Sequence, residues 1–251
     1  MYTCLTTTLS PISYLPLSII YKMIKELIAE AVGTFFFVFS IGVSRGEPFA
    51  VGGTLWCAMV FTGFISGGQF NPAITTAIIL RKWWTKRLTP PVLIHLLFNI
   101  LVQIVASILA ALVAWGIVRY PVYFDVADGY QVGEAFVAEM IYTGIICAVA
   151  LIVGQISESV VYAGGIIALA VTAADWSVGR ISGGCFNPAV AIGLNFVYYA
   201  KDGAHFDIIW LYIFAPLLGS VIGTALAILF LQEVDAQKHE GNPSLNQPLK
   251  D

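Results

Sequence analysis

Six long runs of apolar residues dominate this sequence, and they restrict the folds that the chain can adopt. Each run is close to the roughly 17 to 25 residues that an α-helix needs to cross a bilayer. A helix also satisfies its own backbone hydrogen bonds where water is absent. The sequence therefore predicts an all-α membrane protein with six transmembrane helices. The predicted spans are Leu27–Val43, Phe49–Ile65, Val92–Val118, Val132–Val153, Val160–Ala174 and Ile208–Leu231.

The composition excludes several classes of function. Charged residues make up 11% of the chain, against about 25% in soluble proteins, so an ordinary cytosolic enzyme is excluded. The net charge of -3 leaves no basic surface for nucleic acid. The four cysteines, which we interpret as buried thiols, lack the spacing of a metal site, and no cofactor is predicted. These are Cys4, Cys57, Cys147 and Cys185.

Two further apolar segments, Pro72–Leu80 and Pro188–Tyr199, are too short to cross a bilayer. As helices they would extend about 14 to 18 Å, close to half of a hydrocarbon core about 30 Å thick. Each follows a glycine-rich stretch. We therefore predict two re-entrant half-helices in addition to the six spans.

An internal repeat relates the two halves of the chain. Residues 65–73 and 181–189 are identical at eight of nine positions, and the Ala-Glu pair ending at Glu30 recurs at Glu139. The halves, about 24–118 and 132–231, then hold three spans and one half-helix each. Because three is odd, the second half crosses the membrane inverted relative to the first, an arrangement that places a functional site at the midplane.

The centre of each repeat is an Asn-Pro-Ala motif, which has the chemistry of a helix start. Asparagine is a favoured N-cap and proline is favoured at the first helical position. In an inverted repeat Asn71 and Asn187 should meet near the bilayer centre, with amide donors available. A single motif would favour a simple cap, whereas two copies favour a pore.

At these residues the chain resembles the aquaporins, or major intrinsic protein family, over about residues 24–231. The resemblance is carried by Glu30, Glu139, Gln103 and both motifs, which comprise Asn71, Pro72, Ala73, Asn187, Pro188 and Ala189. It implies a homotetramer in the lipid bilayer, each subunit conducting water passively without catalytic residues. It also implies that both motif amides donate to a passing water and that the half-helix dipoles help to exclude protons. Glu30 and Glu139 would accept loop N–H groups rather than relay protons.

The predicted selectivity filter departs from the family pattern. Val190 stands where most aquaporins have arginine, and the other filter positions fall on Val51, Asp175 and Gly184. Such a filter would be wide and would lack its usual cation, so glycerol, urea or ammonia are alternative permeants. Asp175 either lines the pore or ends the fifth span and pairs with Arg180.

The subclass markers are mixed. Ala191 and Asn195 stand where glycerol-conducting members usually have an aspartate and a basic residue, which favours water. The pair Tyr212-Ile213 stands where water-selective members usually have two aromatic residues, which favours a broader pore.

Basic residues predict the orientation. Lys22, Lys25 and the basic segment 81–87 should face the cytoplasm, which places both termini there in a membrane that the sequence does not identify. Residues 1–23 are predicted to be an N-terminal arm, and 232–251 a polar, disordered tail.

Two other classes of membrane protein remain open. A coupled secondary transporter would use Glu30 or Glu139 as an ion site. An adhesion or structural protein with a narrowed pore would use small residues for assembly, and Gly219 and Gly223 have a suitable spacing. The same glycines also suit packing within one subunit.

Overall fold

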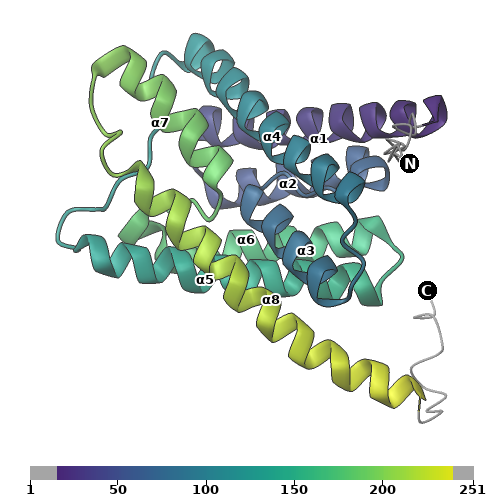
Figure 1. The fold of residues 1–251 in the computed structure, drawn as a ribbon. Helices are drawn as coiled ribbons and strands as arrows, with labels where there is room; N and C mark the ends of the chain where they lie inside the picture. Colours follow the sequence, from purple (N-terminus) through teal and green to yellow (C-terminus); the bar gives the residue numbers. More distant parts are fainter. Residues whose placement is uncertain (1–15, 240–251) are drawn as a thin grey trace, which may run out of the picture.

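The computed structural model describes residues 16–239, with side chains through residue 232, and all of its regular elements are α-helices. Six helices are long and apolar enough to cross a membrane. The predicted fold class is confirmed: six candidate spans accompany two shorter helices (Figure 1). The eight helices are α1 Leu17–Ser44, α2 Pro48–Ser66, α3 Pro72–Trp84, α4 Pro90–Val118, α5 Val132–Ile156, α6 Val160–Ser182, α7 Pro188–Asp202 and α8 Ile209–His239.

Several helices are longer than hydropathy predicted. Helix α1 begins at Leu17, inside the segment predicted as an arm, and α8 continues to His239, into the predicted tail. Helix α6 runs to Ser182 rather than to Ala174. The added turns of α6 carry polar groups such as Asp175, which are compatible with a helix but interrupt an apolar run. The rest of the predicted arm and tail lies outside the described residues.

The arrangement of helices reflects the sequence repeat. Helix α1 packs against α2 and α4 in the first half, while α5 packs against α6 and α8 in the second. The short helices α3 and α7 enter the bundle from opposite sides in Figure 1, and their N-termini approach each other. We call the end with the α3–α4 connection the basic end, because the connection carries Lys86 and Arg87 and the last turn of α3 carries Lys82.

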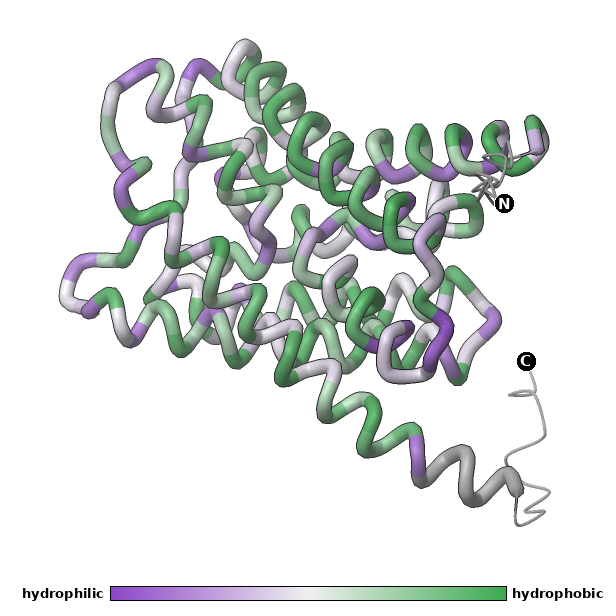
Figure 2. Tube along the Cα trace, in the orientation of Figure 1, coloured by the Kyte–Doolittle hydropathy of each residue, from purple (hydrophilic) through white to green (hydrophobic). Residues whose placement is uncertain are grey.

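Apolar side chains cover both the interior and the outer faces of the bundle. Figure 2 shows hydrophobic residues along the helices and hydrophilic residues mainly in the connections. Large apolar side chains such as Phe61, Phe64, Leu101 and Leu229 are exposed, as a lipid-facing surface requires. Cys57 is also exposed, so the prediction that all cysteines are buried is wrong for this residue, while Cys147 and Cys185 are buried.

Glycines allow close contact between α5 and α8. A Cβ atom built on Gly219 would meet the backbone of Gly144 at 2.9 Å, and one on Gly223 would meet the carbonyl of Gly144 and the Cβ of Cys147. The contact lies within one subunit. The spacing of these glycines is thus explained by intrasubunit packing.

We expect Gly223→Leu to lower the melting temperature of the purified protein markedly. The added side chain would collide with α5 backbone, which cannot rotate away, and overpacking of this kind costs about 1–3 kcal/mol or more. Gly116→Leu is the matched control, because a Cβ at exposed Gly116 meets nothing within 4 Å. Thermal unfolding followed by size-exclusion chromatography checks this, and equal melting temperatures for the two variants would contradict it.

Candidate functional site

The two half-helices begin at the motif asparagines. Asn71 and Asn187 are the N-caps of α3 and α7 and have extended backbones with φ of -155° and -151°. The side-chain oxygen of Asn71 accepts a hydrogen bond from the Ala73 N–H at 2.8 Å. The oxygen of Asn187 accepts from the Ala189 N–H at 3.0 Å. Each asparagine thereby satisfies a helix terminus that would otherwise have unpaired donors.

The same asparagines also join the two halves of the chain. Asn71 Nδ2 donates to the Phe186 carbonyl at 2.9 Å, and Asn187 Nδ2 donates to the Phe70 carbonyl at 2.8 Å. Phe70 and Phe186 have left-handed backbones with φ of 48° and 52°. An asparagine NH₂ group has two protons. One proton of each amide is used in this reciprocal contact, and the other is available to a molecule between the half-helices.

Glu30 holds the first re-entrant loop, residues 67–71, from within α1. Its carboxylate is fully buried and accepts hydrogen bonds from the Phe70 N–H at 2.5 Å and the Gln69 N–H at 3.3 Å. Gln103 of α4 donates to the same carboxylate at 2.7 Å and to Thr75 at 3.0 Å. Buried charge is tolerated only with such partners. The carboxylate is therefore occupied by backbone and side-chain donors.

Glu139 holds the second re-entrant loop, residues 183–187, from the corresponding position of α5. It accepts hydrogen bonds from the Phe186 N–H at 2.6 Å, the Cys185 N–H at 2.9 Å and the Ser182 hydroxyl at 2.7 Å. Like Glu30, it is fully buried. The two loops are thus held by equivalent glutamates on equivalent helices.

A vestibule leads from the basic end toward the asparagines. Its volume is about 440 Å³, and Gly68, Gln155 and Arg81 are among the lining residues. A second, smaller cavity, lined by Leu55, Asn71 and Asn187 among others, has a volume of about 20 Å³. About 10–15 Å³ of such volume holds one water. The centre of the molecule therefore has room for roughly one water at the level of the asparagines.

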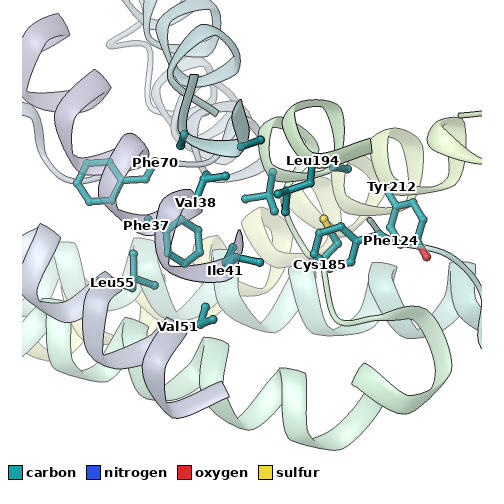
Figure 3. Close-up of a cluster of buried hydrophobic side chains, with 14 of the residues drawn as sticks. Phe37, Val38, Ile41, Val51, Leu55, Phe70, Phe124, Cys185, Leu194 and Tyr212 are labelled. Carbon is teal, nitrogen blue, oxygen red and sulfur yellow. The ribbon is translucent and has the colours of Figure 1, made fainter. Parts of the chain in front are cut away.

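The predicted filter residues lie in two places. The carboxylate of Asp175 lies against Gly184, where a Cβ would meet Asp175 Cγ at 3.1 Å. Val51 and Val190 belong to the buried cluster that also contains Cys185, and Val190 is 0% exposed. Figure 3 shows Val51 and Cys185 among the side chains of this cluster.

The alternative interpretation of Asp175 is not supported. Helix α6 continues beyond Asp175 to Ser182. Among the described residues Asp175 has no ion pair, with Arg180 or with any other cation. Asp175 therefore lies inside the helix and faces the second re-entrant loop. The reason is the extra length of α6, which an apolar run that ends at Ala174 did not predict.

Sequence analysis considered two residues around the second re-entrant loop as subclass markers and did not predict their contacts. Tyr212 of α8 is fully buried and donates its hydroxyl to the Ser182 carbonyl at 2.6 Å. Asn195 of α7, considered only as a subclass marker, is fully buried and contacts two connecting loops. A polar residue within an otherwise apolar half-helix is the signal that could have indicated such a role.

Another pair of residues lies away from the motif asparagines. His95 of α4 contacts Glu26 of α1 at 3.1 Å. Within residues 16–239 no group of three His, Cys, Asp or Glu side chains is arranged to hold a metal ion.

Comparisons with known proteins agree with this geometry. The family model described as "Major intrinsic protein" matches residues 19–227. The chain is 30% identical to Nodulin-26 of Glycine max over 224 residues, which cover 80% of this chain and 75% of that protein. It is 28% identical to a probable NIP-type aquaporin of Nicotiana alata over 216 residues, 80% of this chain and 76% of the relative.

A solved structure shares the fold. The aquaglyceroporin from Plasmodium falciparum aligns with a TM-score of 0.73 at 18% identity, covering 85% of this chain and 99% of that one. Together with six apolar helices, the family match shows an integral, multi-pass membrane protein. The chain belongs to the major intrinsic protein family, whose members are membrane channels.

Proposed function

We propose that this protein is a passive channel for water that excludes protons at the paired asparagines. The observation that carries the proposal is the reciprocal contact of Asn71 and Asn187, which leaves one donor of each amide beside a space for roughly one water. A water that accepts both donors points its own hydrogens outward. The hydrogen-bonded chain that proton hopping needs is then interrupted, and the positive ends of two helices repel cations.

The surroundings of Glu30 and Glu139 favour a channel over a coupled transporter. A transporter needs an ion or proton site that changes occupancy during the cycle. Both carboxylates instead accept three hydrogen bonds each from loops and neighbouring side chains. We therefore propose that they are scaffold groups. We further propose a homotetramer with a channel domain at about 24–231 and both termini in the cytoplasm.

Stopped-flow light scattering on proteoliposomes tests the proposed function. We expect rapid osmotic shrinkage with a low activation energy, and no dissipation of an imposed pH gradient beyond that of empty liposomes. Shrinkage no faster than in empty liposomes would refute the proposal. Flux driven by a pH gradient would favour the transporter.

A second candidate function is conduction of glycerol or another small neutral solute. It is favoured by Val190 and Gly184, which place no long side chain at the predicted filter. The aquaglyceroporin fold is compatible with it. Uptake under an inward glycerol gradient, measured on the same vesicles, distinguishes the two functions.

We expect Val190→Arg to reduce glycerol or urea permeability more than water permeability, so that the ratio of solute to water permeability falls by about tenfold. A guanidinium narrows the filter and adds hydrogen-bond donors that a water molecule can satisfy more easily than a larger solute can. A tenfold change in the permeability ratio corresponds to a difference of about 1.4 kcal/mol between the two permeants. Val190 is fully buried, so Val190→Leu is the control for added volume without charge. Equal reduction of both permeabilities would show that this position does not set selectivity.

We expect Asp175→Asn to change the ratio of glycerol to water permeability. Removal of the carboxylate beside Gly184 leaves the size of the side chain nearly unchanged but removes an acceptor with negative charge. Asp207→Asn, in the connection before α8, is a control with the same change of charge. An unchanged ratio in vesicle assays would contradict a role of Asp175 in the filter.

A further inference from the structure

The connection between α4 and α5, residues 119–131, packs on the second re-entrant loop. The Ala127 N–H donates to the Ile181 carbonyl at 3.0 Å, just before that loop begins. Phe124 is 6% exposed, and a Cβ built on Gly183 would meet its ring at 2.9 Å. Figure 3 shows the Phe124 ring beside Cys185, in the cluster that also contains Val190. The ring thus covers the loop that carries part of the predicted filter.

Asn195 fixes the backbone of Phe124 on both sides. Its Oδ1 accepts a hydrogen bond from the Phe124 N–H at 3.0 Å, and its Nδ2 donates to the Phe124 carbonyl at 2.9 Å. Nδ2 also donates to the His205 carbonyl at 2.8 Å. The fully buried Asn195 side chain therefore joins residues 119–131, the α7–α8 connection and helix α7.

These bonds suit the chemistry of asparagine in particular. Phe124 has no strand or helix to pair its backbone, and buried backbone groups need partners. An amide supplies one acceptor and two donors, whereas a carboxylate supplies acceptors alone. Farther out, Asp125 contacts His205, and Tyr123 stacks on His205 with ring centroids 4.2 Å apart.

We propose that Asn195 is a positioning residue for solute selectivity, acting through Phe124. It holds the Phe124 ring against Gly183, and the ring in turn confines the loop with Gly184, which faces Asp175. This inference rests on the proposed channel function. In this role the Asn195 side chain acts on the neighbouring connection, residues 119–131, and not on the permeant.

Permeability of reconstituted variants tests the effect on selectivity. Asn195→Asp has nearly the same shape but loses both hydrogen bonds that Nδ2 donates, to the Phe124 and His205 carbonyls. Each bond contributes a modest net amount to stability. We therefore expect the ratio of glycerol to water permeability to rise by about tenfold. Gln131→Glu, at an exposed position of the same connection, adds the same charge without touching Asn195. This control should leave the ratio unchanged. An equal ratio in wild type and Asn195→Asp, both folded and conducting, would overturn the proposal.

A second measurement does not depend on conduction. Cys185 is 6% exposed, and the rate at which a charged, membrane-impermeant methanethiosulfonate labels it, located by mass spectrometry, reports how well Phe124 covers the loop. Labelling should be about tenfold faster in Asn195→Asp. If wild type conducts nothing, the proposed function fails. The labelling rate then still decides whether Asn195 positions Phe124, and an unchanged rate overturns that role.

If Asn195→Asp does not fold, Phe124→Leu provides a second test of the proposal. It keeps the backbone bonds to Asn195 and removes only the ring, so both readouts should change in the same direction. If Asn195 acts through this ring, the effects of the two substitutions will not add in the double variant, since residues in one network are coupled. Full additivity, or a Phe124→Leu variant that matches wild type in both readouts, would overturn the proposal.

Discussion

Replacing Glu139 by leucine is expected to eliminate the folded channel. The carboxylate accepts the Phe186 N–H, the Cys185 N–H and the Ser182 hydroxyl, and none of these donors has access to bulk water inside the bundle. Each buried donor left unsatisfied costs about 1–3 kcal/mol. Three such losses are comparable to the total stability of many domains, about 5–15 kcal/mol. The second re-entrant loop should therefore lose its defined conformation.

Thermal unfolding and vesicle permeability check this expectation together. The Glu139→Leu protein should be aggregated or should unfold at a much lower temperature, with no water flux above empty liposomes. Glu158→Leu is the control for stability, because Glu158 is an exposed residue of the vestibule lining whose substitution should leave the fold intact. A stable, conducting Glu139→Leu protein would contradict the scaffold role.

The more conservative Glu139→Gln separates a scaffold from a proton relay. Glutamine keeps one acceptor oxygen but places an NH₂ group against donors, so stability should fall by an intermediate amount. A relay residue would behave differently, since its neutral analogue would keep the fold and lose only coupling to a pH gradient. The same comparison applies to Glu30, which holds the other loop through Phe70 and Gln69.

The sequence predicts well that the two Asn-Pro-Ala motifs meet, because they belong to a repeated local pattern. Asn71 and Asn187 have the same neighbours in both halves, and the odd number of spans implies that they face each other. The structure shows the resulting contact to the opposite loop. The partners of Glu30 and Glu139 are also predictable, because a buried carboxylate in an apolar helix requires hydrogen-bond donors. The repeat places an equivalent loop near each of them.

The region of the predicted filter is less predictable because its contacts join distant segments that do not repeat. Asn195 contacts Phe124, 71 positions away, and nothing in the local pattern of either residue specifies this partner. Asp175 faces Gly184 because α6 continues past the apolar run. Hydropathy marks the part of a helix that fits the bilayer interior, whereas hydrogen bonds and packing determine where the helix ends.

Replacing Asn187 by aspartate is expected to admit cations to the proposed pore at the level of the motif asparagines. The carboxylate keeps an acceptor for the Ala189 N–H, and a negative charge at a helix N-terminus is favourable, so the fold should persist. The donor to the Phe70 carbonyl is lost, and so is the amide proton available to water. A negative charge then stands where two positive helix ends meet.

The size of this effect follows from electrostatics. Two unit charges 4 Å apart interact by about 4 kcal/mol at an effective dielectric constant of about 20, and each 1.4 kcal/mol is a factor of ten. Proton or cation flux through Asn187→Asp vesicles should therefore rise by about a thousandfold. Asn187→Ser loses the same donor but adds no charge, and it should leave cation flux low. If both variants remain impermeable to cations while conducting water, a barrier other than the paired asparagines excludes charge, and the filter beside Asp175 would be the next place to measure it.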